Sequence, residues 1–280
     1  MTLLSVGDRV APGRYRPFSR FSGALAFVRE VHRAGLGGAV LACVVREEKG
    51  EGPLNIVVRG DLAAVLSLEV RPDAVLFGRR LLPIPRRFDS ALRLAGPLSG
   101  SIRENLAAFR GALSEGEGAA LLLRPARALP PSFQAELAAS LREGYDKLLS
   151  GDLPGGAKAL KGRGQGLTPS GDDLLAGFLL GLRAVEAAFG ADLAAERRVV
   201  RRAARSRSLF SESFLRCAAE GRFFEGAQAA ARALLQGNPG QAREAAKRLS
   251  TFGASSGTDL GVGLLAALEL RLPAGQECTL

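Results

Sequence analysis

The apolar positions follow one pattern in the first third of the chain and another in the remainder. Up to about residue 90, short β-branched runs at residues 25–31, 39–47, 54–60 and 64–70 are separated by Gly, Pro and Asp. Such runs are typical of strands. From about residue 100, apolar side chains recur at i, i+3, i+4 and i+7, which is the spacing of an amphipathic helix. The two patterns predict a β-rich region followed by a helical region.

Within the β-rich region, residues 37–60 have the pattern of a hairpin. We predict strands at residues 40–45 and 54–58, joined by a turn at residues 49–53 that contains Gly and Pro. Residues 79–88 contain Pro83 and Pro85, and this composition predicts a connector that leads out of the β-rich region.

The helical region divides into several periodic segments separated by glycine or proline. Gly237, followed by Asn238-Pro239, predicts that one helix stops and another begins there. Residues 151–166 are a glycine-rich stretch that separates two of these segments. We predict helices at residues 102–113, 131–151, 172–189, 194–206, 211–221, 224–237, 239–250 and 259–270.

Two of these segments, residues 173–189 and 259–270, are apolar on nearly every face, so we expect them to be central. The predicted fold class is therefore α+β. A small β-rich N-terminal domain, residues 1–95, precedes a larger, mainly α-helical domain, residues 96–280, that is built on the two central apolar helices.

The same short motif precedes both apolar helices. Residues 170–173 and residues 256–259 share the pattern Ser-Gly-x-Asp. The alignment extends into each helix, and it pairs Ser170 with Ser256, Gly171 with Gly257, Asp173 with Asp259, Leu174 with Leu260 and Gly177 with Gly263. Only two copies occur, so the motif does not indicate a solenoid repeat.

A purely structural interpretation of this motif is a helix cap. Ser170 would cap the backbone N–H near Asp173, and Asp173 would reciprocate as in a capping box. Thr168 followed by Pro169 is a competing helix start, because proline is common at the first helical position. A carboxylate in the first turn also suits the positive end of the helix dipole.

The residues around the first motif favour a second interpretation, a binding site for a small anion. Glycines at positions 162, 164 and 166 would let backbone N–H groups approach a ligand closely. Lys158, Lys161 and Arg163 bring positive charge to the same helix start, a combination that binds phosphate or carboxylate. Recurrence of the motif suggests that two helix N-termini face each other across one pocket. The sequence leaves both interpretations open.

The aspartates of the two motifs are the candidate catalytic residues: Asp172, Asp173 and Asp259. Asp172 and Asp173 are adjacent, so on a helix their side chains point about 100° apart, and we expect one to cap while the other faces the pocket. Asp172 and Asp259 would then contact a carbamoyl or amino substrate. No metal ligand is assigned, although Mg²⁺ remains an open alternative because it needs only one or two carboxylates.

A third polar helix start lies at residues 205–213. Ser208 or Ser211 is expected to cap it. Arg207 is a candidate clamp for a carboxylate or a phosphate, because a guanidinium group donates two parallel hydrogen bonds. Arg207 and Ser208 therefore join the candidate substrate-binding residues.

Composition and known motifs narrow the function classes. The chain carries 38 Lys and Arg against 28 Asp and Glu, a net charge of +10 that attracts anions of any size. The single histidine, His32, cannot build a histidine-based metal cluster, and three scattered cysteines form no CxxC pair. No nucleotide-binding fingerprint occurs. The chain shows neither a signal-peptide pattern nor about 20 consecutive apolar residues, so we expect a cytoplasmic protein.

Three strings together resemble a known family. They are GQGLTPSGDDLLAG at residues 164–177, SLFSESFLRCAAEG at residues 208–221 and FGASSGTDLGVGLL at residues 252–265. The chain resembles the AllH subunit family of oxamate carbamoyltransferase, which belongs to anaerobic allantoin degradation, a branch of purine catabolism. The resemblance is strongest over residues 151–270.

The resemblance implies a subunit of a transferase, a carbamoyltransferase that converts oxalurate and phosphate into oxamate and carbamoyl phosphate, or acts on a related substrate. It also implies partner subunits of the FdrA-like type and small anionic substrates. Fixed N–H groups and cations would stabilise the developing oxyanion. The implied substrate-binding residues at the two motifs are Arg163, Gly164, Gly166, Thr168, Ser170, Gly171, Ser255, Ser256 and Gly257.

Two other function classes stay open. A nucleic-acid-binding protein is one, because five arginines are spaced along one helix at positions 197, 198, 201, 202 and 205. A solvated face or a subunit interface would give the same pattern. A non-catalytic ligand-binding or scaffolding subunit is the other, since the sequence shows no activated nucleophile and no clear general base.

Overall fold

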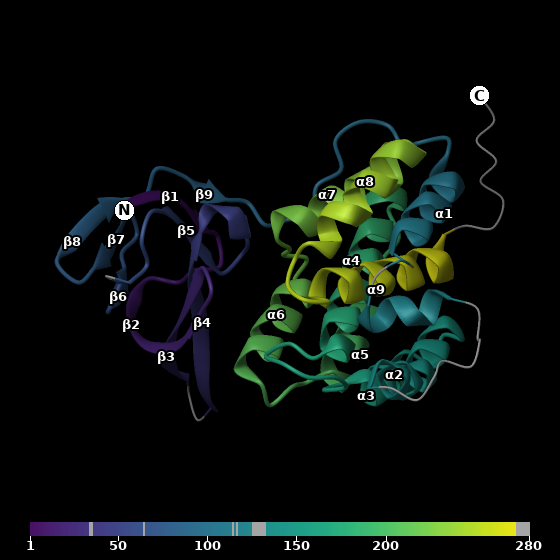
Figure 1. Ribbon diagram of the computed structural model, residues 1–280, viewed down its shortest axis with the longest axis horizontal. Helices are drawn as coiled ribbons and strands as arrows, with labels where there is room; N and C mark the ends of the chain where they lie inside the picture. The colour runs from purple at the N-terminus through teal and green to yellow at the C-terminus, as the bar shows by residue number, and fades with distance from the viewer. Residues whose placement is uncertain (34–35, 64, 114, 116, 125–132, 273–280) are drawn as a thin grey trace. The chain divides into compact units, whose positions relative to one another are not determined.

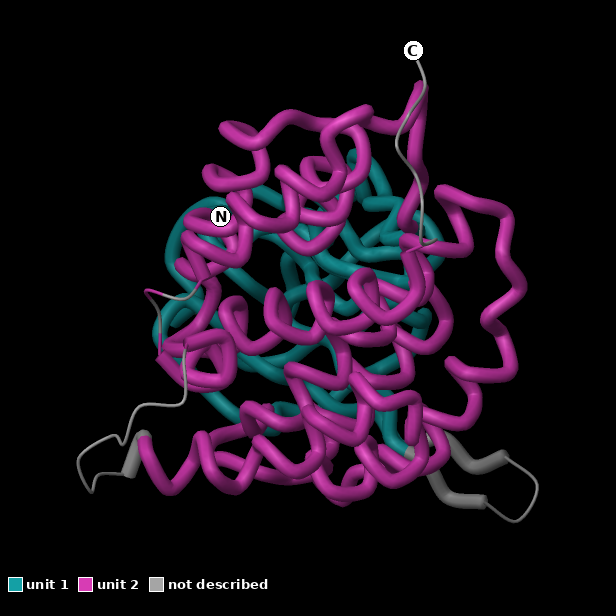
Figure 2. Tube along the Cα trace, turned by 90° about the vertical axis from the view of Figure 1, so that its right-hand side faces the viewer, with its two compact units in different colours: residues 1–91, 222–225 teal, residues 92–221, 226–280 magenta. Residues whose placement is uncertain are grey.

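The computed structural model describes residues 1–33, 36–63, 65–113, 115, 117–124 and 133–272. The chain divides into two compact units: unit 1 comprises residues 1–91 and 222–225, and unit 2 comprises residues 92–221 and 226–280 (Figure 2). Unit 1 is a curled β-sheet and unit 2 is helical (Figure 1), so the predicted α+β fold class is confirmed.

The described strands of unit 1 form one nine-stranded sheet in the order β8-β7-β6-β2-β3-β4-β5-β1-β9. Most neighbours are antiparallel, and β3 with β4 is the longest pairing. The strands are β1 (Thr2–Gly7), β2 (Gly13–Phe21), β3 (Ala24–Arg33), β4 (Leu36–Arg46), β5 (Asn55–Arg59), β6 (Leu68–Val70), β7 (Ala74–Phe77), β8 (Arg80–Pro83) and β9 (Arg87–Phe88).

Alternate side chains of these strands fill one apolar core. Phe27 of β3, Val44 of β4 and Ile56 of β5 are almost fully buried, and Val6 and Val75 join them from β1 and β7. Successive side chains on a strand point to opposite faces. In β4, Ala42 and Val44 therefore face this core, while Leu41, Cys43 and Val45 point to the other face and are buried as well.

The hairpin predicted at residues 37–60 is wrong. Its two strands exist as β4 and β5, but they pair in parallel, from Cys43 opposite Asn55 to Arg46 opposite Val58. This overlap is short, so the connecting residues 47–54 need to return by only about 10 Å along the strand. They do so through a short 3₁₀ helix, η1 (Glu47–Lys49), and a left-handed turn at Gly50. The antiparallel partner of β4 is β3.

The predicted connector at residues 79–88 also differs from the structure. It contains β8, which pairs with β7, and β9, which pairs with β1. Both are outermost in the strand order. Proline lacks a backbone N–H but is tolerated on edge strands. Pro83 and Pro85 are therefore compatible with the short pairings of β8 and β9 at the two ends of the strand order.

Unit 2 consists of helices joined by short loops. Their ranges agree closely with the periodic segments of the sequence. They are α1 (Ile102–Leu113), the 3₁₀ helix η2 (Gly118–Leu123), α2 (Phe133–Leu149), α3 (Leu153–Leu160), α4 (Ser170–Phe189), α5 (Ala194–Ala203), α6 (Leu209–Ala219), α7 (Glu225–Gln236), α8 (Pro239–Ser250) and α9 (Ser256–Arg271). In the part of the chain that the structure describes, none of these helices is long and apolar enough to cross a bilayer.

Two helix boundaries show how local sequence decided the structure. The stop and restart predicted after Gly237 is confirmed: α7 ends at Gln236, and Asn238 forms a capping box with Gln241 at the start of α8. The glycine-rich stretch at residues 151–166, where no helix range was predicted, contains α3. The Asp152 carboxylate accepts a hydrogen bond from the Gly155 N–H at 3.0 Å and so caps a helix that tolerates two glycines.

The two apolar helices, α4 and α9, pack against each other in the middle of unit 2, with the other helices around them (Figure 1). Their contact is unusually close. A Cβ on Gly177 would lie 1.8 Å from the carbonyl oxygen of Leu260, and a Cβ on Gly263 would lie 1.9 Å from that of Leu174. The prediction of two central apolar helices is confirmed, and glycines at the crossing let their backbones touch.

Candidate functional site

The two Ser-Gly-x-Asp motifs begin α4 and α9 in the same way. The N–H of Gly171 donates to the carbonyl oxygen of Arg163 at 2.8 Å, and the N–H of Gly257 donates to that of Phe252 at 2.9 Å. A Cβ on either glycine would lie within about 2 Å of a carbonyl oxygen at the end of the preceding helix, Leu160 of α3 or Leu249 of α8. The repeated motif is therefore a repeated structure, α3–loop–α4 and α8–loop–α9.

The crossing of α4 and α9 relates the two copies to each other. The glycine of each copy touches the leucine carbonyl of the other, Gly177 with Leu260 and Gly263 with Leu174. These reciprocal contacts are those of two helices related by a local two-fold axis. Both helices begin at the same end of the crossing, since the Thr168 and Ser256 hydroxyl oxygens are 3.5 Å apart. The two motifs therefore meet, as the sequence predicts.

The predicted capping box is wrong. The N-cap residues are Pro169 for α4 and Ser255 for α9, and neither side chain caps its helix. The N–H groups of Asp172 and Asp173 instead donate to the Pro169 carbonyl oxygen, at 2.8 and 3.1 Å. Since these N–H groups and that of Gly171 are already bonded within the chain, they are not available to an anion in this conformation. The hydroxyl groups of the motif have partners on the opposite helix.

Asp259 is held by groups from three segments. The Ala119 N–H, at the start of η2, donates to its Oδ1 at 2.6 Å, and the Ser255 hydroxyl donates to its Oδ2 at 2.9 Å. The Ser170 hydroxyl of the other helix start also bonds to this carboxylate. Gly118 makes room for the contact, because a Cβ there would lie 2.4 Å from Asp259 Oδ1.

Asp173 is the counterpart of Asp259 and has fewer partners. The Thr168 hydroxyl donates to its Oδ2 at 3.0 Å, and the Ser256 hydroxyl of the other helix start bonds to the same carboxylate. Each aspartate thus binds the serine of the opposite motif, Asp173 with Ser256 and Asp259 with Ser170. Two carboxyl groups and four hydroxyl groups form one network, which we call the Ser–Asp network (Thr168, Ser170, Asp173, Ser255, Ser256 and Asp259).

The two halves of this network differ in exposure. Ser170 and Asp259 are buried, with Asp259 fully inaccessible, whereas Asp173 and Ser256 are partly exposed. Burial raises the pKa of Asp259 to about 6, against the lowering effect of its hydrogen bonds. Surrounding protein atoms also raise the pKa of Asp173 well above its usual value, and the nearby charge of Asp259 adds to that rise. The half formed by Ser170 and Asp259 is buried, and the half formed by Ser256 and Asp173 is partly accessible to solvent.

Asp172 takes a separate position. Its Oδ1 accepts a hydrogen bond from the Gly162 N–H at 2.8 Å, while its Oδ2 is buried and has no partner. The two adjacent aspartates thus have different partners, as their spacing on a helix predicts. The charge of Asp172 is close enough to raise the pKa of Asp173 further. A buried polar atom without a partner is rare and indicates that a hydrogen-bond donor is missing.

The loop between α3 and α4 is longer than the loop between α8 and α9. Gly162, Gly164 and Gly166 have φ values of +71°, +109° and +95° there, which favour glycine. Gly164 lies against the first residue of α4, because a Cβ on it would be 2.7 Å from the Ser170 nitrogen. The Arg163 side chain is exposed, and its Nε donates to the Ala159 carbonyl oxygen at 3.2 Å.

The third polar helix start joins the same loop. The Ser208 hydroxyl donates to the Leu167 carbonyl oxygen at 2.9 Å and caps α6 by accepting from the Ser211 N–H. Of the two candidate caps, Ser208 is therefore confirmed. Arg207 is exposed beside it. The structure thus brings Ser208 to the α3–α4 loop and leaves Arg163 and Arg207 at the surface.

Comparison with protein families gave a match over residues 160–268, to the model described as oxamate carbamoyltransferase subunit AllH. We call these residues the AllH segment, after the family model that they match. The predicted resemblance is confirmed over this range. Comparisons with curated proteins and with solved structures gave no match.

The AllH segment begins at the last residue of α3 and ends within the last turns of α9. It therefore contains both helix starts, the α3–α4 loop, the Ser208 cap and every member of the Ser–Asp network. Only Gly118 and Ala119, which reach Asp259 from η2, lie outside it. Sequence reasoning missed these two residues, because a backbone N–H that binds a side chain 140 positions away leaves no local signal.

Both oxygens of Asp259 already accept hydrogen bonds from the chain, so the protein itself provides partners for this carboxyl group. Among the described residues, no three His, Cys, Asp or Glu side chains form a group that could hold a metal ion.

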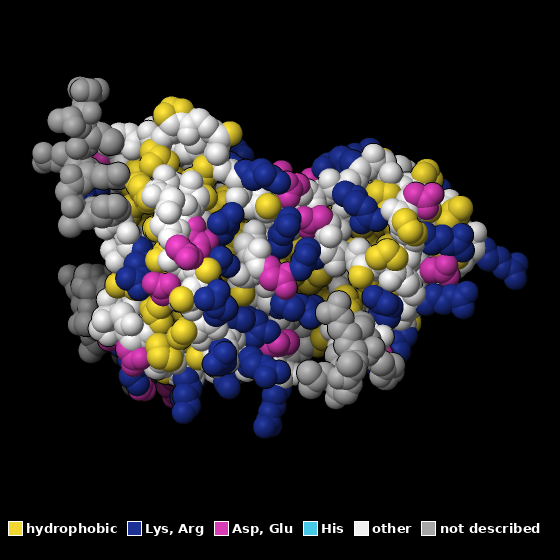
Figure 3. Space-filling view, turned by 180° about the vertical axis from the view of Figure 1, so that it is seen from behind, with side chains coloured by type: hydrophobic (Ala, Val, Ile, Leu, Met, Phe, Trp, Pro, Cys, Tyr) yellow, Lys and Arg dark blue, Asp and Glu magenta, His cyan; other side chains and the backbone are white. Residues whose placement is uncertain are grey.

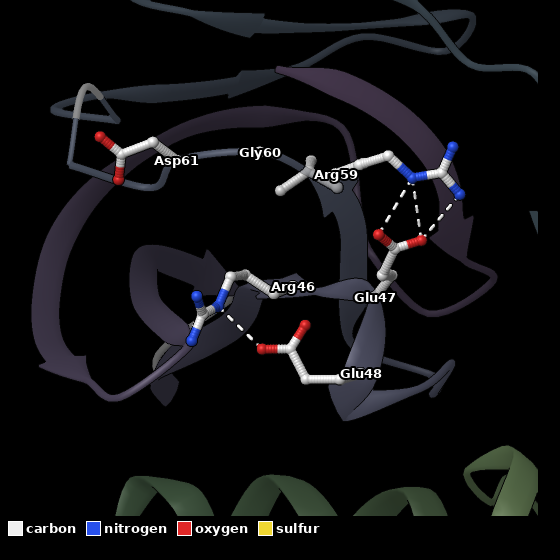
Figure 4. A pocket seen from close by; sticks show the side chains of 7 residues that line it. Arg46, Glu47, Glu48, Arg59, Gly60 and Asp61 are labelled. Atoms are coloured by element: carbon white, nitrogen blue, oxygen red, sulfur yellow. Dashed lines mark hydrogen bonds and ion pairs between the residues drawn. The ribbon is translucent and has the colours of Figure 1, made fainter.

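A pocket in unit 1 has a different character. It has a volume of about 430 Å³ and lies beside the ends of β4 and β5. Two exposed ion pairs line it, Arg59 with Glu47 and Arg46 with Glu48, each with a nitrogen–oxygen distance of 2.8 Å (Figure 4). Since these charges neutralise each other, the pocket offers little net positive charge to an anion.

The arginine-rich helix α5 does not form a uniform basic face. The Arg197 guanidinium pairs with Glu186 at 3.1 Å, and Arg201 pairs with Glu212, so both side chains are largely covered. Figure 3 shows Lys and Arg on many parts of the face it presents, with Asp and Glu among them. Internal ion pairs therefore account for part of the arginine pattern that nucleic-acid binding would otherwise explain.

The raised pKa of Asp259 predicts a specific dependence of stability on pH. With a pKa of about 6 in the fold, against an ordinary value of 3.8, the folded state holds the proton more tightly than the unfolded state. The contribution of this group to the free energy of unfolding is fully present when the pH is below the ordinary pKa of 3.8. It is lost as the pH rises to about 6, by roughly 3 kcal/mol in total.

Asp259→Asn removes the titration and keeps an acceptor for the Ala119 N–H. Urea denaturation at pH 4 and pH 7 should show that the variant gains about 3 kcal/mol relative to the wild type over this interval. A difference that stays constant between the two pH values would contradict the burial of a titrating carboxyl group here.

Proposed function

We propose that this chain is a subunit of a carbamoyltransferase that converts oxalurate and phosphate into oxamate and carbamoyl phosphate. The observation that carries the proposal is the AllH match, which encloses the complete Ser–Asp network. Both substrates are small anions, and exposed cationic side chains, Lys161, Arg163 and Arg207, flank the helix starts that hold this network. The proposal places the protein in the cytoplasm, in allantoin degradation.

The geometry supports a division of labour within the site. A carboxyl group accepts hydrogen bonds, so the Asp173 end suits the amide N–H groups of a carbamoyl substrate better than it suits an anion. The carboxylate or phosphate would lie toward Arg163 and Arg207, since guanidinium groups bind these anions with two parallel hydrogen bonds.

The role of the helix N-termini changes in this proposal. The N–H groups of Gly171, Asp172 and Asp173 bond to chain carbonyls, so the developing oxyanion would be stabilised by hydroxyl groups and cations instead. Thr168 and Ser256 are the hydroxyl groups nearest the exposed carboxyl group. Four glycines would fix the backbone that carries these hydroxyl groups: Gly164, Gly166, Gly171 and Gly257.

Partner subunits are part of the proposal, because the matched family is named as a subunit. An FdrA-like chain is the expected partner. The exposed half of the Ser–Asp network would then be completed and shielded from water by the partner, which strengthens electrostatic contacts at the site.

The decisive experiment is an assay of the purified chain alone, of the partner subunits alone and of the assembled complex. Oxalurate and phosphate are supplied, and carbamoyl phosphate is detected through carbamate kinase and ADP as newly formed ATP. The complex should form ATP and the partners alone should not. Equal rates with and without this chain would refute an active role and favour a scaffolding subunit.

A further inference from the structure

We propose that Ser256 is a nucleophile, with the Asp173 carboxylate as its general base, and that the carbamoyl group passes through an ester of Ser256. This inference rests on the proposed carbamoyl transfer and adds a covalent step to it. Sequence reasoning found no activated nucleophile, because Ser256 and Asp173 belong to different motifs 83 positions apart and meet only across the helix crossing.

The first argument is the asymmetry between two equivalent pairs. Ser170 with Asp259 and Ser256 with Asp173 occupy matching positions in the repeat, so the sequence does not distinguish them. In the structure, Asp259 is tied to the Ala119 N–H and to Ser255, and both Ser170 and Asp259 are buried. Such a pair holds η2 in place and is closed to a substrate. Ser256 and Asp173 are partly exposed.

The second argument is the arrangement around Asp173. A nucleophile, a base and a third group that orients the base are the recurring components of an activated hydroxyl. Here the Thr168 hydroxyl donates to Asp173 Oδ2 at 3.0 Å, which fixes the carboxyl group, and lies 3.5 Å from the Ser256 hydroxyl, so Ser256 and Asp173 meet around one hydroxyl group. Burial first, and then the neighbouring charges of Asp259 and Asp172, raise the pKa of Asp173, so its carboxylate is a stronger base than that of an ordinary aspartate.

The third argument concerns the ligand. Asp172 Oδ2 is buried without a partner in the same helix turn, which leaves an acceptor for a donor such as an amide N–H. Ser256 is itself the first residue of α9, where the positive end of the helix stabilises negative charge that develops on the serine oxygen.

The proposed reaction has two balanced steps. Ser256 Oγ attacks the carbamoyl carbon of oxalurate while Asp173 takes the hydroxyl proton. The bond from that carbon to the oxamate nitrogen breaks, and the nitrogen receives the proton from Asp173. An oxygen of hydrogen phosphate then attacks the carbamoyl carbon and loses its proton to Asp173. The bond to Ser256 Oγ breaks, Oγ regains the proton, and carbamoyl phosphate leaves.

The first test uses cyanate, which adds to a nucleophilic hydroxyl group and leaves the same carbamoyl ester. The purified chain is treated with cyanate and digested, and its peptides are analysed by mass spectrometry. Ser256 should carry a carbamoyl group, whereas Ser150 and Ser250, which bond only to helix carbonyls, should remain unmodified. Ser256→Ala should abolish this modification.

The general base is tested by Asp173→Asn, which keeps the size of the side chain and should slow the modification of Ser256 about a hundredfold or more. Circular dichroism checks that the variant is folded. Ser256→Cys gives a second measurement, because its thiol should react with iodoacetamide faster than the thiol of a Ser250→Cys control. An unmodified Ser256, or a Ser256→Cys thiol no more reactive than the control, would overturn the inference.

The second test separates this inference from the proposed function. The assembled complex is incubated with oxalurate and isotope-labelled oxamate without phosphate. A carbamoyl ester predicts that label enters oxalurate, because the first step is reversible. If no exchange occurs although the complex forms carbamoyl phosphate, the covalent step is refuted and the proposed function stands. If the complex forms no carbamoyl phosphate, the proposed function itself fails.

Discussion

Gly177→Ala should lower the free energy of unfolding of unit 2 by at least about 2 kcal/mol, the largest stability effect that we expect of a single methyl group here. The added Cβ would lie 1.8 Å from the Leu260 carbonyl oxygen and 2.9 Å from the Leu260 Cα, so the clash is with backbone and no side-chain rotation relieves it. Urea denaturation followed by the helical circular dichroism signal measures the loss, since the long helices all lie in unit 2.

Gly111→Ala is the matched control. It also lies within a helix, but its Cβ would have no neighbour within 4 Å, so higher helix propensity should stabilise the protein by up to about 1 kcal/mol. Gly263→Ala should resemble Gly177→Ala, because its clash with Leu174 is the reciprocal one. Similar stability of Gly177→Ala and Gly111→Ala would show that the helices do not cross as described.

Asp173→Asn should reduce kcat for carbamoyl phosphate formation by about 10²- to 10⁴-fold in the assembled complex, which is the range for loss of a general base. The amide has nearly the same shape and can still accept a hydrogen bond from Thr168, so the fold should be kept. The coupled ATP assay gives the rate, and thermal unfolding of the isolated chain reports on the fold.

Asp259→Asn is the comparison that makes this result informative. Asp259 occupies the equivalent position in the repeat but is fully buried and bonded to Ala119 and Ser255. We expect it to change stability and its pH dependence more than the chemical step. Equal losses of kcat for the two variants would mean that the partly exposed half and the buried half of the network do not have separate roles. An unchanged kcat for Asp173→Asn would show that Asp173 takes no part in the mechanism.

Periodicity in the sequence was enough to predict most of unit 2, because each amphipathic helix repeats its own burial pattern locally. The α1 range, residues 102–113, follows directly from its apolar spacing. The short helix α3 was missed because two glycines and a proline concealed an eight-residue segment whose stability comes from the Asp152 cap and from packing.

Long-range pairing was harder to predict than the elements themselves. Residues 40–45 and 54–58 have the spacing of a hairpin, yet β3 takes the antiparallel position beside β4. No local feature of the sequence shows which strand will pair with a given neighbour. Because β4 and β5 overlap over a short length, a short connection is enough to bring them into a parallel pairing.

The meeting of the two helix starts was predicted from the sequence, but the hydrogen bonds between them were not. The repeated motif correctly indicated that residues 170 and 256 begin two helices that meet. The expected local bonds were wrong because Ser170 bonds to Asp259, and Ser256 to Asp173, across the helix crossing. A serine followed three positions later by a carboxylate has the same sequence in either case, and only the tertiary structure decides between the two partners.

The backbones of α4 and α9 touch at Gly177 and Gly263. This contact affects how the residues at the two helix starts can change during evolution. The spacing of the two helix starts is set by peptide groups, so exchanging a hydroxyl or a carboxyl group above the crossing alters the chemistry while the scaffold keeps its dimensions. A framework of this kind is able to acquire a new specificity through one or two point substitutions, without first having to be repacked.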